Sequence, residues 1–312
     1  MSSAPVPPQG PGSVPSQAKN SWWVQKSPLV IFFVALFGVS VVLAWGLQSV
    51  GKKVMASFAS QAALPENRSA ASQPAGDSSQ QSKAEALLQK VAAGDDAAAQ
   101  EVLDESDDWN GKTRRTPAAD QLLNVSLNSS SLHTRQASLQ AELAMDGVER
   151  SEAGLDRLEP ALKDPSTRAW ALWMTGAMGN RGVDPMRAAI MISAYLQDPD
   201  VNTRVAAVNA FSLLGTDPSI PLVLDRFFND SSSAVQERAA CGLAQSGMYT
   251  HEQRMTAAAA FVARLDSPKL SPQQHAWMLQ ALRDISGKNL GNNSADWQQW
   301  LDSATPFPQD KY

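Results

Sequence analysis

The sequence contains only one cysteine, Cys241, and three histidines among its 312 residues. A single cysteine excludes an intramolecular disulfide framework and any cysteine-rich zinc or iron–sulfur site. The chain also lacks an excess of basic residues, since 26 Lys and Arg face 31 Asp and Glu. A nucleic-acid-binding protein needs a basic face, so we expect no nucleic-acid partner. Hydrophobic residues make up 43% of the chain, which is too many for a wholly disordered protein.

One stretch, Pro28–Leu47, has no charged residue at all. A helix of this length, rising about 1.5 Å per residue, crosses the roughly 30 Å hydrocarbon core of a bilayer. Trp22 and Trp23 precede it and Trp45 lies near its far end, where indole rings favour the lipid–water interface. The apolar part of a cleaved signal peptide is shorter, about 7–15 residues. We therefore predict an uncleaved, single-pass transmembrane helix at residues 28–47.

The lysines beside this segment do not decide its orientation. Lys19 and Lys26 precede it, while Lys52 and Lys53 follow it, so the positive-inside rule gives a tie. Beyond Lys53, acidic residues outnumber basic ones, and such a domain gains nothing from an anionic cytoplasmic lipid surface. We predict a membrane protein whose C-terminal domain lies outside the cytoplasm.

The segments on either side of the predicted span have the composition of flexible chain. Residues 1–27 are rich in Pro, Gly, Ser and Gln and are expected to form a disordered tail. Residues 48–82 are rich in Ala, Ser and Gln and read as a flexible linker. Residues 304–312 form a short C-terminal tail. The remaining segment, 83–303, is the predicted folded domain.

Within 83–303, Asp, Pro and Gly residues recur at similar intervals and divide the chain into short helical segments. Strand patterns are nearly absent, and apolar residues follow helical spacing. The recurring segments run from Asp164 to Gly179, from Asp198 to Gly215 and from Asp230 to Gly247. A fourth segment runs from Thr134 to Gly147, and its distance from the Arg to the Gly is one residue longer. Their aligned positions, Arg135, Arg168, Arg204 and Gln236, are 33, 36 and 32 residues apart. Helical units of this period predict stacked helix pairs.

The residue types in each unit have simple physical roles. An Asp or Ser at the turn caps the following helix. Ala171, Ala207 and Ala239 lie three positions after the Arg or Gln and allow neighbouring helices to approach closely. We expect Gly179, Gly215 and Gly247 to adopt the left-handed conformation that ends a helix.

The pattern resembles the short bacterial HEAT-like repeat, in which D-P-x-V-R-x-x-A-A-x-A-L-G marks the second helix. The matching residues are Asp198, Pro199, Arg204, Ala207, Ala210 and Gly215, and then Val235, Gln236, Ala239, Ala240, Leu243 and Gly247. The resemblance covers about residues 117–287. Gln236 departs from it, and residues 83–116 match poorly. It implies an all-α, HEAT-like α-α solenoid, which follows the transmembrane helix predicted from the segment Pro28–Leu47.

The C-terminal end is similar to a G-x-x-[FL]-G ending followed by W-x-x-W that some bacterial HEAT-like proteins carry. Gly287 and Gly291 turn the chain, and Trp297 and Trp300 follow. We expect the two indoles to cover the apolar end of the array as a cap.

Five residues are candidates for binding a partner. Arg135, Arg168 and Arg204 recur in register and form either an anion-binding row or a structural ladder to neighbouring units. Trp170 and Trp173, three residues apart, form either an exposed partner patch or the filling of a gap between helices.

Catalytic and metal-binding patterns are incomplete. His251 and Glu252 begin an HExxH pattern, but Met255 stands where the second histidine is needed. His133 and His275 lack metal-ligand spacing, and we expect both on helix surfaces.

Two further groups of residues are interpreted as structural and not as a metal-binding or catalytic site. The acidic run Glu101–Asp108 does not fit a calcium loop, and we expect a solvated acidic surface there. Cys241 lies among Ala239, Ala240 and Leu243, so we expect a buried small residue rather than a nucleophile. We predict no cofactor and no metal.

These observations predict a membrane-anchored HEAT-like repeat scaffold that binds a protein or peptide partner on its surface. Two alternatives stay open. One is an enzyme, since some HEAT-like repeat proteins resemble bilin lyases. The other is a structural subunit of a membrane complex.

Overall fold

The computed structural model describes residues 78–303. The predicted tails, the predicted span Pro28–Leu47 and most of the predicted linker lie outside the described residues. Residues 78–303 contain helices and no strand, so the all-α prediction is confirmed for this part of the chain. The helices are α2 (Ser78–Ala92), α3 (Asp96–Glu105), α4 (Pro117–Leu127), α5 (Leu132–Met145), α6 (Glu152–Lys163), α7 (Arg168–Asn180), α8 (Pro185–Ser193), α9 (Val201–Leu214), α10 (Ser219–Asn229), α11 (Ser233–Cys241), α12 (His251–Val262), α13 (Pro272–Ser286) and α14 (Ser294–Ser303).

Two short elements interrupt this series. A 3-10 helix, η1 (Ser106–Trp109), follows α3, and a π-helix, η2 (Gly242–Ser246), follows α11. Helix α2 begins at Ser78, earlier than the expected start of the domain at residue 83. None of the helices in 78–303 combines the length and the hydropathy needed to cross a membrane.

Side-chain caps begin most of these helices. The side chains of Asp95, Thr116, Ser131 and Asp200 each accept a hydrogen bond from the backbone amide three residues on. Such a cap satisfies an amide that the helix itself leaves without a partner. The first helical residue of α4, α8 and α13 is a proline, whose fixed φ suits that position. Local sequence therefore sets the helix starts.

Helices α2–α5 with η1 form what we call the N-terminal block. Its core consists of buried residues of all four α-helices, among them Leu88, Val102, Leu123 and Met145. His133 of α5 bonds Asp96 of α3, and Gln140 of α5 bonds the carbonyl of Leu103. Both pairs are separated by 37 residues, so α3 and α5 run parallel as equivalent helices of two stacked pairs. The poorly matching segment 83–116 thus folds as a helix pair.

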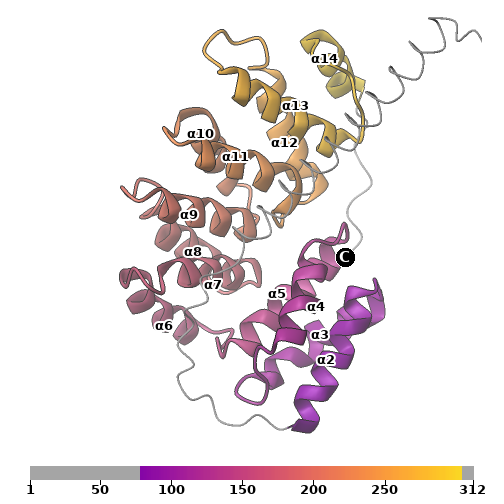
Figure 1. Ribbon diagram of the computed structural model, residues 1–312, viewed down its shortest axis with the longest axis vertical. Helices are drawn as coiled ribbons and strands as arrows, with labels where there is room; N and C mark the ends of the chain where they lie inside the picture. The colour runs from indigo at the N-terminus through magenta and orange to yellow at the C-terminus, as the bar shows by residue number, and fades with distance from the viewer. Residues whose placement is uncertain (1–77, 304–312) are drawn as a thin grey trace, which may run out of the picture. The chain divides into compact units, whose positions relative to one another are not determined.

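Helices α6–α14 form what we call the C-terminal block. Its pairs are α6/α7, α8/α9, α10/α11 and α12/α13, and they stack in chain order toward α14 (Figure 1). Asn180 of α7 bonds the carbonyl of Leu214 in α9, 34 residues on. Gly176 of α7 faces Ala210 of α9 at the same separation. The second helices of these pairs are therefore parallel and in register, which is compatible with an α-solenoid.

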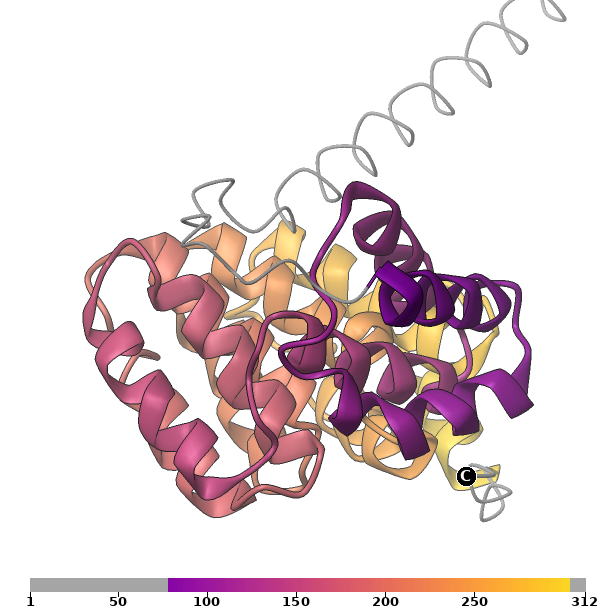
Figure 2. The same cartoon turned by 90° about the horizontal axis from the view of Figure 1, so that it is seen from below.

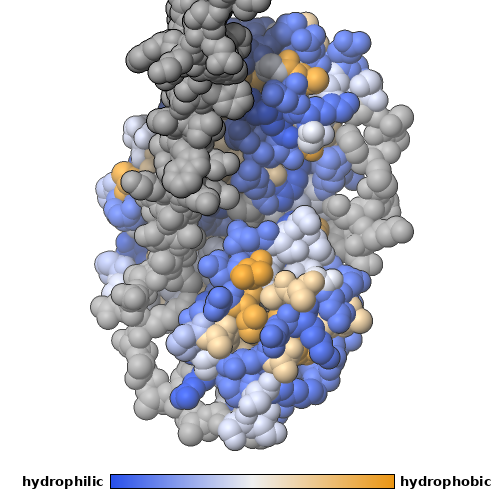
Figure 3. Space-filling model, turned by 45° about the vertical axis from the view of Figure 1, so that its right-hand side comes forward, coloured by the Kyte–Doolittle hydropathy of each residue, from blue (hydrophilic) through white to orange (hydrophobic). Residues whose placement is uncertain are grey.

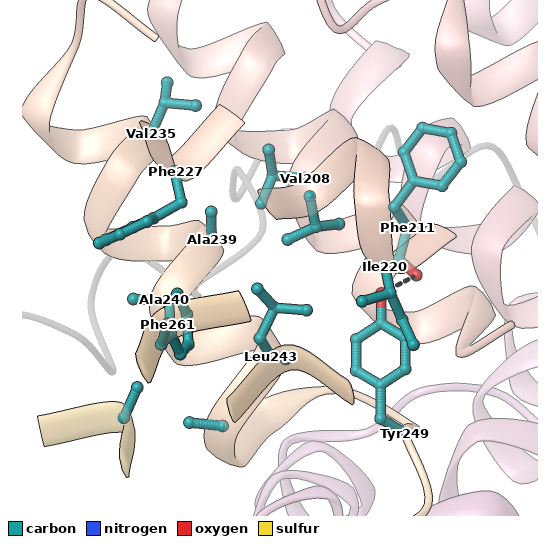
Figure 4. Close-up of a cluster of buried hydrophobic side chains, with 14 of the residues drawn as sticks. Val208, Phe211, Ile220, Phe227, Val235, Ala239, Ala240, Leu243, Tyr249 and Phe261 are labelled. Carbon is teal, nitrogen blue, oxygen red and sulfur yellow. Dashed lines mark hydrogen bonds between the residues drawn. The ribbon is translucent and has the colours of Figure 1, made fainter. Parts of the chain in front are cut away.

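The backbones of α7 and α9 approach each other closely. A Cβ atom placed on Gly176 would lie 2.4 Å from the carbonyl oxygen of Ala210. Farther along the block, Val208, Phe211, Leu243 and Tyr249 pack in the shared core, and the Tyr249 hydroxyl donates to the Phe211 carbonyl at 3.4 Å (Figure 4). Small residues thus set the helix spacing, and larger ones fill the layers between.

The two blocks meet where α5 contacts α7, a boundary we call the seam. Trp170 bonds Asp146, Trp173 bonds Glu142 and Arg181 bonds Gln140, with separations of 24, 31 and 41 residues. Because the separation grows, α5 runs antiparallel to α7. The segment Thr134–Gly147, expected as a unit in one continuous array, is instead the last unit of the N-terminal block (Figures 1 and 2).

The prediction that a left-handed glycine ends the helix is wrong for two of the three glycines. Gly215 ends α9 with φ of +63°, as expected. Gly179 lies inside α7, where a Cβ would meet Leu214 at 2.4 Å. Gly247 has φ of −84° and lies 2.5 Å, measured from an added Cβ, from the carbonyl oxygen of Gly242. Both positions require glycine for close packing and not for left-handed geometry.

Helix α14 lies at the C-terminal end of the array. Trp297 is fully buried, Trp300 is 7% exposed, and both belong to the main core of the C-terminal block. Their rings meet edge to face with centroids 5.8 Å apart. Gly287 and Gly291, with φ of +65° and +72°, turn the chain between α13 and α14.

Candidate functional site

Equivalent positions of the second helices in the C-terminal block form a row, which we call the second-helix stripe. Its members on α7, α9 and α11 lie two and five residues after the recurring Arg or Gln of their unit, and all members are half-buried. Parallel helices in register place equivalent residues on one face, so the row crosses α7, α9, α11 and α13. The stripe consists of Trp170, Trp173, Ala206, Asn209, Arg238, Cys241 and, from α13, Trp277.

The middle of the stripe is small and polar. Ala206 and Asn209 of α9 separate the tryptophans of α7 from the charged residues of α11. The Asn209 amide oxygen has no hydrogen-bond partner among the described residues. An acceptor shielded from water without a partner costs about 1–3 kcal/mol, so a donor brought by a bound molecule would recover part of that free energy.

The predicted residues Trp170 and Trp173 lie at one end of the stripe, against the seam. The indole N–H of Trp170 donates to Asp146 at 3.0 Å, and that of Trp173 donates to Glu142 at 2.9 Å. Both rings also pack on the cluster of buried residues around α5, α6 and α7. Their polar edges therefore face α5, and their half-buried rings fill the space between the two helices.

Arg115 completes this junction from the N-terminal block. It pairs with Glu142 and also contacts Asp120 and Asp146, so three carboxylates surround one guanidinium. Burial alone would lower the pKa of Arg115, but the charges of Glu142 and Asp146 outweigh it and raise that pKa. Glu142 is only 2% exposed, and its carboxylate contacts both Arg115 and Trp173.

The three predicted arginines lie at one recurrent position with similar contacts. Arg135 donates to the carbonyl of Ser129, Arg168 to Leu162 and Arg204 to Asp198, in each case six residues back, at 2.8–2.9 Å. Gln236 repeats this bond to the carbonyl of Asp230 at 2.6 Å. These side chains satisfy carbonyl groups at the turn that precedes their own helix. Their geometry fits the structural alternative.

Arg204 adds a contact between units. Its guanidinium makes two hydrogen bonds, each 2.9 Å, to the carboxylate of Asp230 at the end of α10. Burial acts to raise the pKa of Asp230, but its hydrogen bonds with Arg204 and Ser232 outweigh this effect and lower that pKa. This buried ion pair links the α8/α9 pair to the α10/α11 pair.

The other end of the stripe is polar. Glu237, next to the stripe residue Arg238, is bonded by the indole of Trp277, and burial raises the pKa of Glu237. Cys241 is half-buried, which differs from the expected buried position. Burial raises the pKa of its thiol, which does not favour the reactive thiolate at neutral pH.

The histidine and acidic residues make no metal centre in the described part of the chain. Among residues 78–303, no three His, Cys, Asp or Glu side chains are placed to hold a metal ion. His133, expected on a helix surface, is only 9% exposed, and its ring bonds Asp96 at 2.6 Å. In the acidic run, Glu105 pairs with Lys83 and Asp107 with Arg150.

No protein-family model matches this sequence, and no curated protein is significantly similar to it. The candidate site therefore rests on the geometry of the chain itself. Of its residues, sequence reasoning identified Trp170 and Trp173 but missed Ala206 and Asn209. The signal in the sequence that could have identified them is their position two and five residues after the recurring Arg204.

Proposed function

We propose that this protein is a membrane-anchored, HEAT-like helical-repeat scaffold that binds a protein or peptide partner. The observation that supports it is the second-helix stripe, a continuous row of half-buried side chains on successive parallel helices. Stacked helix pairs present extended surfaces that suit long partners. The proposal keeps Trp170 and Trp173 as partner-binding residues. Arg135, Arg168 and Arg204 are assigned to structure because their guanidinium groups are engaged within the chain.

The anchor in this proposal is the apolar segment Pro28–Leu47, joined by residues 48–77 to the helical domain. The domain itself lies outside the cytoplasm. A reporter that is active only in the cytoplasm, fused after Tyr312, tests this topology. An active fusion would contradict it, and extraction of the full chain by alkaline carbonate would contradict the anchor.

Photo-crosslinking from the stripe tests partner binding. A photoreactive amino acid replaces Ala206 or Asn209 in the full chain, expressed in its native membrane. Both lie at the centre of the row, so we expect a discrete crosslinked protein. The matched control is Leu222 on α10, which is 38% exposed and lies outside the stripe. Equal crosslinking at all three positions, or none at Ala206 and Asn209, would contradict the proposal.

A competing surface is an apolar pair on α8. Met186 and Ile190, one helical turn apart, are 67% and 63% exposed. Single exposed apolar residues are normal on protein surfaces, and two do not make an interface. The face shown in Figure 3 is mainly hydrophilic, with a small apolar area in its lower half. The stripe is favoured because it continues over four helices.

A further inference from the structure

The connection between η1 and α4 contains the only Asn-Gly pair of the chain, Asn110 and Gly111. Trp109, the last residue of η1, is 1% exposed and fixes the start of the connection in the core of the N-terminal block. Gly111 is exposed and has φ of +74°, a backbone conformation that glycine adopts readily. An asparagine followed by a glycine is typical of such tight turns. The pair therefore lies on a surface turn that is anchored at one end.

The side chain of an asparagine can react with the backbone of the residue that follows it. The backbone nitrogen of that residue attacks the side-chain carbonyl carbon, a new C–N bond closes a succinimide ring, and the side-chain nitrogen leaves as ammonia. Water then adds to one of the two ring carbonyls and opens the ring. One opening gives aspartate, and the other gives isoaspartate, in which the backbone continues through Cβ. Water is the only co-reactant, and a following glycine favours the attack because no Cβ hinders its nitrogen.

Both reacting groups of this pair lack hydrogen bonds to residues 78–303. The side-chain amide of Asn110 makes none, and the backbone N–H of Gly111 makes none. A Cβ atom placed on Gly111 would have no other atom within 4 Å, so the space around the attacking nitrogen is open. The reaction therefore has no hydrogen bond to break at either group and no neighbouring side chain to displace.

Two asparagines in other turns differ in both respects. The side chain of Asn128 donates to a backbone carbonyl of α4 at 2.8 Å, and Ser129 follows it. The side-chain oxygen of Asn293 accepts from the backbone N–H of Ala295 at 3.1 Å, and Ser294 follows it. Such local hydrogen bonds hold the side chain in place, and the Cβ of the following serine crowds the backbone nitrogen. Both positions are therefore expected to react more slowly.

We propose that Asn110 is a site of spontaneous deamidation and isomerisation in the folded protein. The inference is independent of the proposed scaffold function and needs no partner. It rests on three features that no other asparagine in residues 78–303 combines. A glycine follows Asn110, neither reacting group is hydrogen-bonded to the described residues, and the turn is open to water at Gly111 and Lys112.

The two products have different effects on this turn. The carbonyl of Trp109 accepts from the backbone N–H of Lys112 at 2.9 Å and from that of Thr113 at 3.0 Å. Isoaspartate adds a methylene to the backbone inside the turn, so the two bonds cannot both keep their geometry. Aspartate leaves the backbone unchanged and adds a carboxylate near Asp107, which already pairs with Arg150. Only isoaspartate is expected to loosen the connection from η1 to α4.

Peptide mass spectrometry of the full chain, kept in detergent micelles at mildly alkaline pH, tests the proposal. We expect conversion at Asn110 to be roughly tenfold faster than at Asn128 and Asn293, which are internal controls in the same sample. Methyl transfer by protein isoaspartyl methyltransferase labels the isoaspartate product. The variant Asn110→Gln should lose this label, because the longer side chain would have to close a larger ring.

Hydrogen exchange measures the effect on the turn. The aged chain should lose protection at the amides of Lys112 and Thr113 in proportion to its isoaspartate content. The variant Asn110→Asp is the matched control, because it adds the charge without the methylene and should keep this protection.

Each outcome decides the proposal. Equal conversion at Asn110, Asn128 and Asn293 would overturn it. Conversion far slower in the folded chain than in a free peptide of residues 107–113 would show that the fold protects Asn110, and would also overturn it. A label that persists in Asn110→Gln would place the reaction at another residue. The crosslinking that tests the scaffold function does not depend on any of these measurements, so the two proposals can fail separately.

Discussion

The two blocks build the same helix pair but hold successive pairs together differently. In the N-terminal block, side chains bridge α3 and α5, as His133 does to Asp96 and Gln140 to Leu103. In the C-terminal block, Gly176 brings the backbone of α7 against that of α9. Backbone contact demands a small residue at a fixed place, whereas a side-chain bridge allows several residue types. The repeat is visible in the sequence of the C-terminal block and of the α4/α5 pair, and it is hidden in the sequence of the α2/α3 pair.

Truncating the terminal tryptophan should give the largest effect and should separate the blocks. Trp297→Ala removes a fully buried ring, and we expect the C-terminal block to lose about 3–5 kcal/mol of unfolding free energy. Hydrogen exchange resolved by residue measures both blocks at once. Protection in α2–α5 should change little. In the control Trp297→Phe, most of the buried area remains, so a loss as large as that of Trp297→Ala would contradict the cap.

Adding one methyl group at the α7–α9 contact should cost somewhat less. Gly176→Ala places Cβ against the carbonyl oxygen of Ala210, and we expect a loss of about 1–3 kcal/mol from overpacking. Guanidinium-induced unfolding measures it. At the control position, Gly242→Ala, the nearest atom is the Ser212 hydroxyl oxygen, a side-chain atom that can rotate at the cost of its bond to the Val208 carbonyl. Equal losses at both positions would show that backbone contact does not set the spacing.

A milder change addresses the seam. Trp170→Phe removes the indole donor to Asp146 and should cost about 1 kcal/mol. Because this bond joins the blocks, their unfolding transitions should move apart. Tyr195→Phe is the control, since its hydroxyl donates to the carbonyl of Leu162 within one block. If both variants separate the transitions equally, the seam is not what couples the blocks.

Acid should produce the smallest difference. Asp164, Asp200, Asp225 and Asp230, whose pKa values are lowered in the fold, all lie in the C-terminal block. A carboxylate whose pKa is lowered in the fold stabilises the folded state at pH values above its ordinary pKa of 3.8. This stabilisation is lost as the pH falls through the pKa of the folded state. Between about pH 4 and pH 2, this block should lose exchange protection before the other. Asp230→Asn should flatten that dependence, and simultaneous loss in both blocks would contradict it.

Local chemistry made the helix pairs of the C-terminal block predictable. The turn residues and the recurring Arg act within a few positions of their own helix, as the bond from Arg168 to Leu162 shows. The same reasoning misplaced Gly179 and Gly247, because a glycine at a helix end and a glycine at a helix crossing look alike in sequence. Only the neighbours Leu214 and Gly242 distinguish them.

The seam was beyond prediction from sequence for a different reason. Arg135 keeps the bond to its preceding turn, so its unit resembles the others locally. Its antiparallel contact with α7 depends on Glu142 and Asp146 meeting residues 24 to 31 positions away. No short-range pattern encodes that orientation. The stripe residues shared this difficulty, since Ala206 and Asn209 become a surface only once the helices are stacked.

The parallel register of α7, α9, α11 and α13 has a consequence for how such a chain can change in length. Duplicating or deleting one helix pair within α6–α13 would reproduce junctions of a kind already present, such as that between Gly176 and Ala210. The same operation at the α5–α7 boundary would destroy a contact that has no second copy within residues 78–303. Gene duplication or protein engineering can therefore change the number of helix pairs within α6–α13, whereas the contact at the α5–α7 boundary has to be kept.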